Sequence, residues 1–189
     1  MKEYGILGGT FDPPHYAHLE IAKRASKQFS LSKVVFVPAG NPWHKEGNIS
    51  SYEHRYKMTQ LLVSSSNNFE VSDLESDTSN PTYTIETLRK IPETDENFLI
   101  IGADVAKEIH TWKDYDEIFH HTKILVAPRK GVSSEDIENI FPGPYSIIQG
   151  DEVDLNSTII RTRIDELDIL EEMIPLNIIQ YIKDNSLYG

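Results

Sequence analysis

Short apolar runs alternate with longer amphipathic segments along most of this chain. The apolar runs predict buried strands at residues 4–9, 33–38, 69–72, 97–104, 123–127 and 145–149. Apolar positions at helical spacing predict helices over residues 14–29, 51–66, 82–91, 113–121, 133–140, 157–167 and 175–188. Strands that alternate with helices predict an α/β fold, a doubly wound parallel sheet with right-handed crossovers and helices on both faces.

The 189 residues suffice for one domain with a sizeable core, and no repeat or low-complexity tract divides them. We expect a single domain over 1–189, with a core over about 1–150 and a small helical region over about 151–189. Turns rich in glycine, proline or charged residues follow three predicted strands, at 8–18, 38–45 and 102–104. Ligands of parallel sheets bind beyond the carboxyl ends of the strands, so we expect these turns to form one crevice.

Composition narrows the classes of partner. The net charge of −12 opposes binding to nucleic acid and to anionic membranes, and no apolar run approaches the roughly 18 residues of a membrane span. The absence of cysteine excludes disulfides, a thiolate nucleophile and a cysteine zinc site. No export signal is recognisable, and we expect a cytoplasmic protein. If the ligand is an anion, its site must be a positively charged region on an otherwise negative protein. Clusters of basic residues therefore indicate where such a site could lie.

The most distinctive stretch is GGTFDPPHYAH, residues 8–18, which we name the signature segment. A strand that ends in Gly8-Gly9 and leads into a helix presents free N–H groups and a positive dipole end, which suit phosphate. His15 and His18 share one face of that helix. On residue types alone, the histidines could also bond the backbone or form half of a zinc site, but no further ligands complete one. The spacing is not the dinucleotide fingerprint G-x-G-x-x-G.

The signature segment resembles the G-G-T-F-D-P-x-H-x-G-H motif of nucleotidyltransferases related to class I tRNA synthetases, and most closely that of the nicotinate-nucleotide adenylyltransferases. Five further motifs follow in the family's order: PAGNPWHK resembles N-x-x-P-P-H-K, TYTIET resembles S-Y-T-x-D-T, IIGAD with Trp112 resembles G-A-D-x7-W, NSTIIR resembles S-S-T-x-I-R, and IPLNIIQYIKDNSLYG resembles the C-terminal helix and tail. The likeness covers essentially the whole chain. It implies a Rossmann-like fold.

The resemblance implies adenylyl transfer from ATP to nicotinate mononucleotide, giving deamido-NAD and pyrophosphate. Such chemistry needs no covalent nucleophile, because the mononucleotide phosphate attacks directly. It requires two anions held together and stabilisation of the charge on the departing pyrophosphate. The expected cofactor is Mg²⁺, bound mainly through substrate phosphates, so no protein metal cage is expected. The expected partners are ATP and nicotinate mononucleotide, and a homo-oligomer is compatible with the sequence.

By resemblance, His15, His18 and Arg161 are the catalytic residues, and all three contact the ATP phosphates. Asn156, Ser157 or Thr158 could cap a helix that carries Arg161 on the same face. Asp104, which could instead cap a helix, is expected at the ATP ribose. The complete expected ATP-binding set is Gly8, Gly9, Thr10, Phe11, His15, His18, Gly102, Asp104, Ser157, Thr158 and Arg161.

The expected mononucleotide site uses flat rings and backbone amides. The indole of Trp112 suits stacking on a pyridine ring, and the N–H groups of Tyr83 and Thr84 suit the nicotinate carboxylate. Each feature also has an ordinary structural explanation: Trp112 could be a core residue, and Tyr83-Thr84 could simply begin a helix. The complete expected set is Thr10, Asn41, Lys45, Tyr83, Thr84 and Trp112.

The chain departs from the family motifs at Ala17, Trp43, Glu86 and Asn156. VAPRKG misaligns with the family's V-x-R-P-G, so Arg129 is left out of the predicted site. Two alternative functions remain open at this stage. Phosphopantetheine adenylyltransferase shares part of the motifs but not TYTIET, Trp112 or the tail, and a non-catalytic nucleotide-binding module would not require two histidines together with Arg161.

Overall fold

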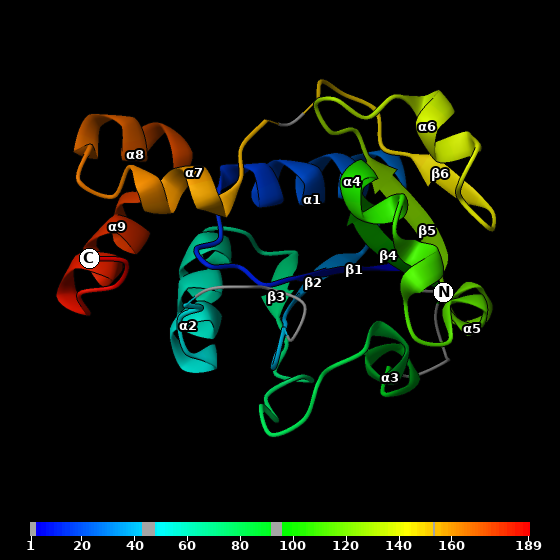
Figure 1. The fold of residues 1–189 in the computed structure, drawn as a ribbon, viewed down its shortest axis with the longest axis horizontal. Coiled ribbons are helices and arrows are strands. Elements are labelled where there is room, and N and C mark those ends of the chain that lie inside the picture. Colours follow the sequence, from blue (N-terminus) through cyan, green and yellow to red (C-terminus); the bar gives the residue numbers. More distant parts are fainter. Residues whose placement is uncertain (1–2, 43–47, 92–95, 153) are drawn as a thin grey trace.

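The structure is a computed structural model that describes residues 3–42, 48–91, 96–152 and 154–189. Within these residues, six parallel strands form one sheet in the order β3-β2-β1-β4-β5-β6 (Figure 1). The strands are β1 (Glu3–Gly9), β2 (Lys33–Pro38), β3 (Phe69–Val71), β4 (Glu96–Gly102), β5 (Lys123–Ala127) and β6 (Tyr145–Ile147). The predicted doubly wound α/β fold is confirmed. Because the strand order reverses between β1 and β4, the crevice typical of such sheets lies beyond their carboxyl ends.

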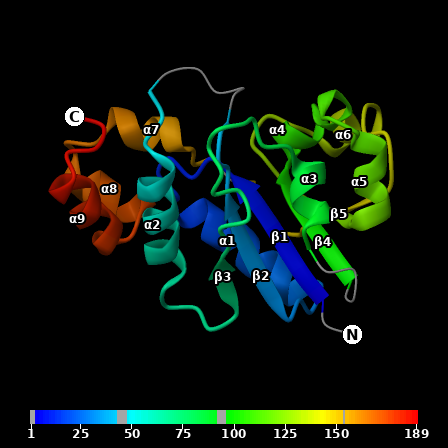
Figure 2. The ribbon, with the colours of Figure 1, turned by 90° about the horizontal axis from the view of Figure 1, so that it is seen from below.

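Helices cover both faces of the sheet, as Figures 1 and 2 show from two directions. One face packs against α1 (Tyr16–Gln28) and α2 (Tyr52–Val63), and the same core takes in the C-terminal helices α7 (Ser157–Thr162), α8 (Leu167–Met173) and α9 (Leu176–Asp184). The other core holds residues of α3 (Thr84–Arg89), α4 (Ala103–Ala106), the 3-10 turn η1 (Ile109–Thr111), α5 (Tyr115–His121) and α6 (Ser134–Glu138).

The two cores follow from the alternation of side chains along each strand. In β1, Ile6 packs into one core and Leu7 into the other, and Leu99 and Ile100 repeat this pattern in β4. Successive strand residues face opposite sides, so a strand covered on both sides needs apolar residues at nearly every position. This is why the central strands are unbroken apolar runs in the sequence.

The helices differ from the prediction near the C-terminus and after β4. The single helix predicted over 157–167 is wrong, because α7 ends at Thr162 and α8 begins at Leu167. The last helix ends at Asp184 rather than at residue 188, since Ser186 and Tyr188 adopt left-handed backbone angles (φ 49° and 67°) that do not continue a helix. The unpredicted α4 and η1 span four and three residues, too few for apolar spacing to reveal.

Candidate active site

The carboxyl end of β1 leaves open space beside Gly8. A Cβ built on Gly8 would meet no heavy atom within 4 Å, whereas one on Gly9 would lie 3.0 Å from the Phe11 ring. A side chain at Gly9 would therefore crowd the Phe11 ring, whereas Gly8 leaves the open approach to the backbone that a phosphate needs. The Phe11 ring itself is buried and packs against Phe36 and His18, so its side chain is not open to a ligand.

The two predicted histidines lie together at the start of α1. His15 is the N-cap residue, and its ring stacks on that of His18 with the centroids 3.8 Å apart. The backbone N–H of His15 donates to Nδ1 of His18 over 3.2 Å. A neutral imidazole that accepts at Nδ1 carries its proton on Nε2, so His18 offers an Nε2–H donor to a ligand.

Both imidazoles are neutral near pH 7 in this structure. Burial, with a smaller contribution from the nearby positive charge of Arg129, lowers the pKa of His18 to about 3. Burial also lowers the pKa of His15 well below its ordinary value, with smaller contributions from His18 and Arg129. Among the described residues, the buried Nδ1 atom of His15 has no hydrogen-bond partner, which is uncommon in an interior unless a ligand or water supplies one. The two imidazole rings can therefore form hydrogen bonds with a ligand while uncharged.

Arg129 supplies the positive charge beside this pair, although the sequence analysis leaves it out of the site. Its Nη1 donates to the carbonyl oxygen of Leu155 over 3.0 Å, and its Nε lies 3.6 Å from a carboxylate oxygen of Asp104. Arg129 therefore connects the predicted ribose residue to the histidines. Arg129 lies two residues beyond β5, a strand that ends at the crevice, and this position could have indicated that it belongs to the site.

Asp104 lies in the first turn of α4, and Gly102 occupies the N-cap position of that helix. The alternative that Asp104 caps the helix is therefore excluded. A Cβ on Gly102 would come within 2.4 Å of Oδ1 of Asp104, so glycine is needed for this carboxylate to fold back over the strand end. The side chain of Asp104 is half exposed and accessible to a ligand.

The start of α7 is tied to the signature segment. Asn156, rather than Ser157 or Thr158, caps the helix by accepting from the N–H of Ile159 over 3.0 Å. The hydroxyl of Ser157 donates to the carbonyl oxygen of Pro13 over 2.9 Å. Arg161 donates from Nη1 to the carbonyl oxygen of Asp12 over 2.7 Å and from Nη2 to the hydroxyl of Thr158 over 3.2 Å. A guanidinium has five N–H groups, so Arg161 retains donors for a phosphate.

Arg55, which the sequence analysis misses, joins the loops that follow β1 and β2. It is 1% exposed and donates to the carbonyl oxygens of Ser50, Thr10 and Gly40 over 2.9, 2.8 and 3.1 Å. Burial lowers the pKa of Arg55, and the nearby carboxylate of Asp12 opposes this effect. Arg55 lies three residues before the buried Met58, on the same face of α2. This spacing could have indicated that the arginine points into the core.

The residues predicted to bind the mononucleotide flank β2 and α3. The N–H of Gly40 and the hydroxyl of Thr87 both donate to the carboxylate of Glu75, over 3.4 and 2.5 Å, which links the loop carrying Asn41 to α3. Tyr83 is the N-cap residue of α3, Thr84 begins the helix, and Lys113 Nζ lies 4.5 Å from the centre of the Tyr83 ring. Trp112 is half-buried against the core that contains α3. The prediction for Lys45 lies outside the described residues.

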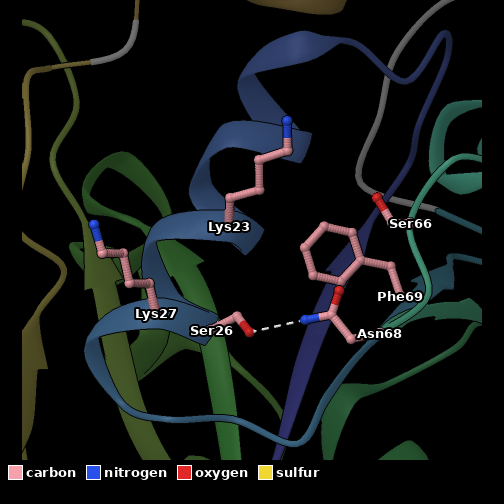
Figure 3. Close-up of a pocket in the computed structure, with 6 residues that line it drawn as sticks. All are labelled: Lys23, Ser26, Lys27, Ser66, Asn68 and Phe69. Atoms are coloured by element: carbon pink, nitrogen blue, oxygen red, sulfur yellow. Dashed lines mark hydrogen bonds between the residues drawn. The ribbon is translucent and has the colours of Figure 1, made fainter.

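Two hollows in the described part of the chain are lined by other residues. Figure 3 shows one of about 280 Å³ between the C-terminal half of α1 and the start of β3, lined by Lys23, Ser26, Lys27, Ser66, Asn68 and Phe69. Another, of about 430 Å³, lies beside α9. Within the described residues, no helix is long and apolar enough to cross a membrane, and no three His, Asp or Glu side chains gather as metal ligands.

Comparisons with known proteins agree with this arrangement. The sequence model of the cytidylyltransferase-like family matches residues 6–163. A Clostridium botulinum protein named "Probable nicotinate-nucleotide adenylyltransferase" is 40% identical, over 100% of this chain and 98% of that protein. A Leifsonia xyli protein of the same name is 36% identical, over 97% and 92%. The solved Plasmodium falciparum nicotinic acid mononucleotide adenylyltransferase, complexed with NaAD, superposes with a TM-score of 0.86 at 22% identity, over 100% and 98%. The chain therefore belongs to the cytidylyltransferase-like family and, within it, to the nicotinate-nucleotide adenylyltransferases.

Proposed function

We propose that this chain transfers the adenylyl group of ATP to nicotinate mononucleotide, giving deamido-NAD and pyrophosphate. The observation that carries the proposal is the convergence of a neutral histidine pair with Arg129 and Arg161 at the open end of β1. In a protein of net charge −12, such a group of donors is suited to a polyphosphate. The names of the full-length relatives support the identity of the second substrate.

The reaction proceeds by direct in-line attack. An oxygen of the mononucleotide phosphate forms a bond to the α-phosphorus of ATP, and the bond from that phosphorus to the bridging oxygen of pyrophosphate breaks. The attacking phosphate has a second pKa of about 6 and is already mostly dianionic at pH 7, so it needs no general base. No covalent intermediate on the protein is required. The protein must instead orient two anions and stabilise the charge that moves onto pyrophosphate.

Neutral and charged residues have different roles in orienting the substrates and stabilising the charge. Gly8 lets the triphosphate approach the end of β1, where the Nε2–H of His18 donates to a phosphate oxygen. Since His18 is neutral, it stabilises the transition state through a directed hydrogen bond. Arg129 and Arg161 add the formal positive charge, and Arg161 is our candidate for the leaving pyrophosphate. Asp104 accepts from the hydroxyls of the ATP ribose.

We propose that magnesium enters with ATP as part of the substrate, held by phosphate oxygens and water. The carboxylates near the site have other partners: Asp12 accepts from Tyr188 and Ser50, and Asp104 lies 3.6 Å from Arg129 and is assigned above to the ATP ribose. These pairings favour a metal whose ligands come from the substrate. Its chemical contribution is to neutralise charge on the phosphates.

On the other side of the crevice, we propose that the pyridine ring stacks on Trp112 and that its carboxylate meets the backbone N–H groups at Tyr83 and Thr84. Asn41 and Lys45 are our candidates for the mononucleotide phosphate. The ammonium group of Lys113 lies close to the Tyr83 ring but is paired with the carboxylate of Glu86, so the backbone N–H groups are our candidates for attracting the substrate carboxylate. We therefore expect the acid mononucleotide to be preferred over the amide.

Pyrophosphate release tests the proposal directly. The protein is incubated with ATP and Mg²⁺ and with nicotinate mononucleotide, nicotinamide mononucleotide or phosphopantetheine. We expect turnover with the acid mononucleotide and a higher kcat/KM for it than for the amide. Equal kcat/KM for acid and amide contradicts the carboxylate site, and turnover with phosphopantetheine alone contradicts the assigned substrate.

A further inference from the structure

The C-terminal segment folds back onto the signature segment. After α9, the N–H of Leu187 donates to the carbonyl oxygen of Ile182 over 3.0 Å, and left-handed angles at Ser186 and Tyr188 reverse the chain. The hydroxyl of Tyr188 then donates to Oδ1 of Asp12 over 2.5 Å, across 176 residues of sequence. The end of the chain is thus in direct contact with the predicted phosphate-binding loop.

Asp12 depends on this contact because it is buried, with 3% of its surface exposed. Its Oδ2 accepts from the backbone N–H of Ser50 over 3.3 Å. The guanidinium of Arg55 is near enough to attract this carboxylate, but within the described chain no lysine, arginine or histidine forms an ion pair with it. A buried carboxylate is costly unless donors satisfy it. Burial and the bond to Asp12 raise the pKa of Tyr188, so the phenol keeps its proton and donates at neutral pH.

The backbone of the same loop holds Arg161. The carbonyl oxygen of Asp12 accepts from Nη1 of Arg161, and the next carbonyl, of Pro13, accepts from Ser157. A buried carboxylate that loses one of its two donors is left partly unsatisfied, and it regains a partner by rotating or by shifting the main chain that carries it. A small displacement of a group that binds a transition state can cost up to about 100-fold in rate.

We propose that Tyr188 is a positioning residue for adenylyl transfer: its hydroxyl fixes the carboxylate of Asp12, and the main chain of Asp12 fixes the guanidinium of Arg161. The inference rests on the proposed function, because it assigns a step to Arg161. Tyr188 itself does not touch the substrates in this proposal, and it acts through Asp12 and Arg161.

The test is Tyr188→Phe, which removes only the hydroxyl, with Tyr181→Phe as the matched control. Tyr181 also ties the C-terminal region to the rest of the chain, through a 2.9 Å hydrogen bond from α9 to His54 in α2, but it does not touch Asp12. Both variants should lower the Tm by a few degrees. Only Tyr188→Phe should lower kcat, by about 10-fold, with the KM for ATP changed less than about 3-fold.

Coupling to Arg161 separates positioning from a general loss of stability. In an Arg161→Ala background, Tyr188→Phe should lower kcat by less than about 2-fold further, because both changes act on one unit. Hydrogen exchange at the N–H of Ser50, which needs no substrate, should be faster in Tyr188→Phe and unchanged in Tyr181→Phe.

An unchanged kcat in Tyr188→Phe, an equal loss in both single variants, or an additive loss with Arg161→Ala overturns the inference while leaving the proposed function intact. A wild-type protein that releases no pyrophosphate with any of the mononucleotides overturns the proposed function instead. In that case, the exchange of Ser50 still decides whether Tyr188 holds Asp12.

Discussion

Replacing Arg129 with alanine tests the electrostatic description of the site most directly. The change removes a half-buried positive charge beside the histidine pair, together with a hydrogen bond to Leu155 and a 3.6 Å approach to Asp104. A hydrogen bond between charged groups contributes about 1.5–3 kcal/mol. If Arg129 contacts a phosphate in the transition state, its loss should lower kcat/KM by roughly 10- to 150-fold.

The same variant makes a second, independent measurement possible. Arg129 is the second cause, after burial, that lowers the pKa of His18 to about 3. Without that charge the pKa should rise, yet remain below the ordinary value of about 6.5, because the ring is still buried. NMR titration of the imidazole signals of the ligand-free protein measures this shift without any substrate.

Lys130→Ala is the matched control. It changes the net charge by the same amount one residue away, but Lys130 is exposed and pairs with Asp154 over 2.6 Å. We expect wild-type kinetics and an unchanged His18 titration in this variant. A kcat/KM within about 3-fold of wild type in Arg129→Ala, or a titration of His18 identical to that of Lys130→Ala, would refute the placement of Arg129 in the site.

Three further predictions test other parts of the site. His18→Ala should lower kcat by at least about 100-fold with unchanged circular dichroism, and near-wild-type turnover would remove His18 from the mechanism. Gly8→Val should fold, because the space there is open, but should raise the KM for ATP; unaltered ATP kinetics would show that no phosphate approaches Gly8. The free energy of unfolding should fall as the pH is lowered from 6.5 to 5, because the unfolded chain binds protons at His15 and His18 that the folded chain does not. The slope, at most about 1.4 kcal/mol per pH unit for each histidine, is measured by urea denaturation and should be smaller in His18→Gln; a flat profile contradicts the buried neutral pair.

The residues of the predicted site that the structure brings together belong to local motifs, so the sequence could point to them. The spacing of His15 and His18 places them at the N-cap and in the first turn of one helix, and Thr158 and Arg161 share a face of another helix because they are also three residues apart. By contrast, Arg129 was not assigned to the site, because the segment VAPRKG is offset by one position from the family's V-x-R-P-G. Its neighbours in the sequence give no indication that it lies near the histidines. Arg55 was missed because a buried arginine that binds only backbone carbonyls has no motif of its own.

The sequence by itself determined which segments are strands and where a phosphate could approach the backbone, because burial on both faces and an open strand end leave local patterns. Only the tertiary structure decided which distant segments meet. The reversal of strand order between β1 and β4 brings Arg129 beside His15, and the turn after α9 brings Tyr188 to Asp12. Each of these contacts joins residues more than 100 positions apart, so it depends on the packing of the whole sheet and its helices.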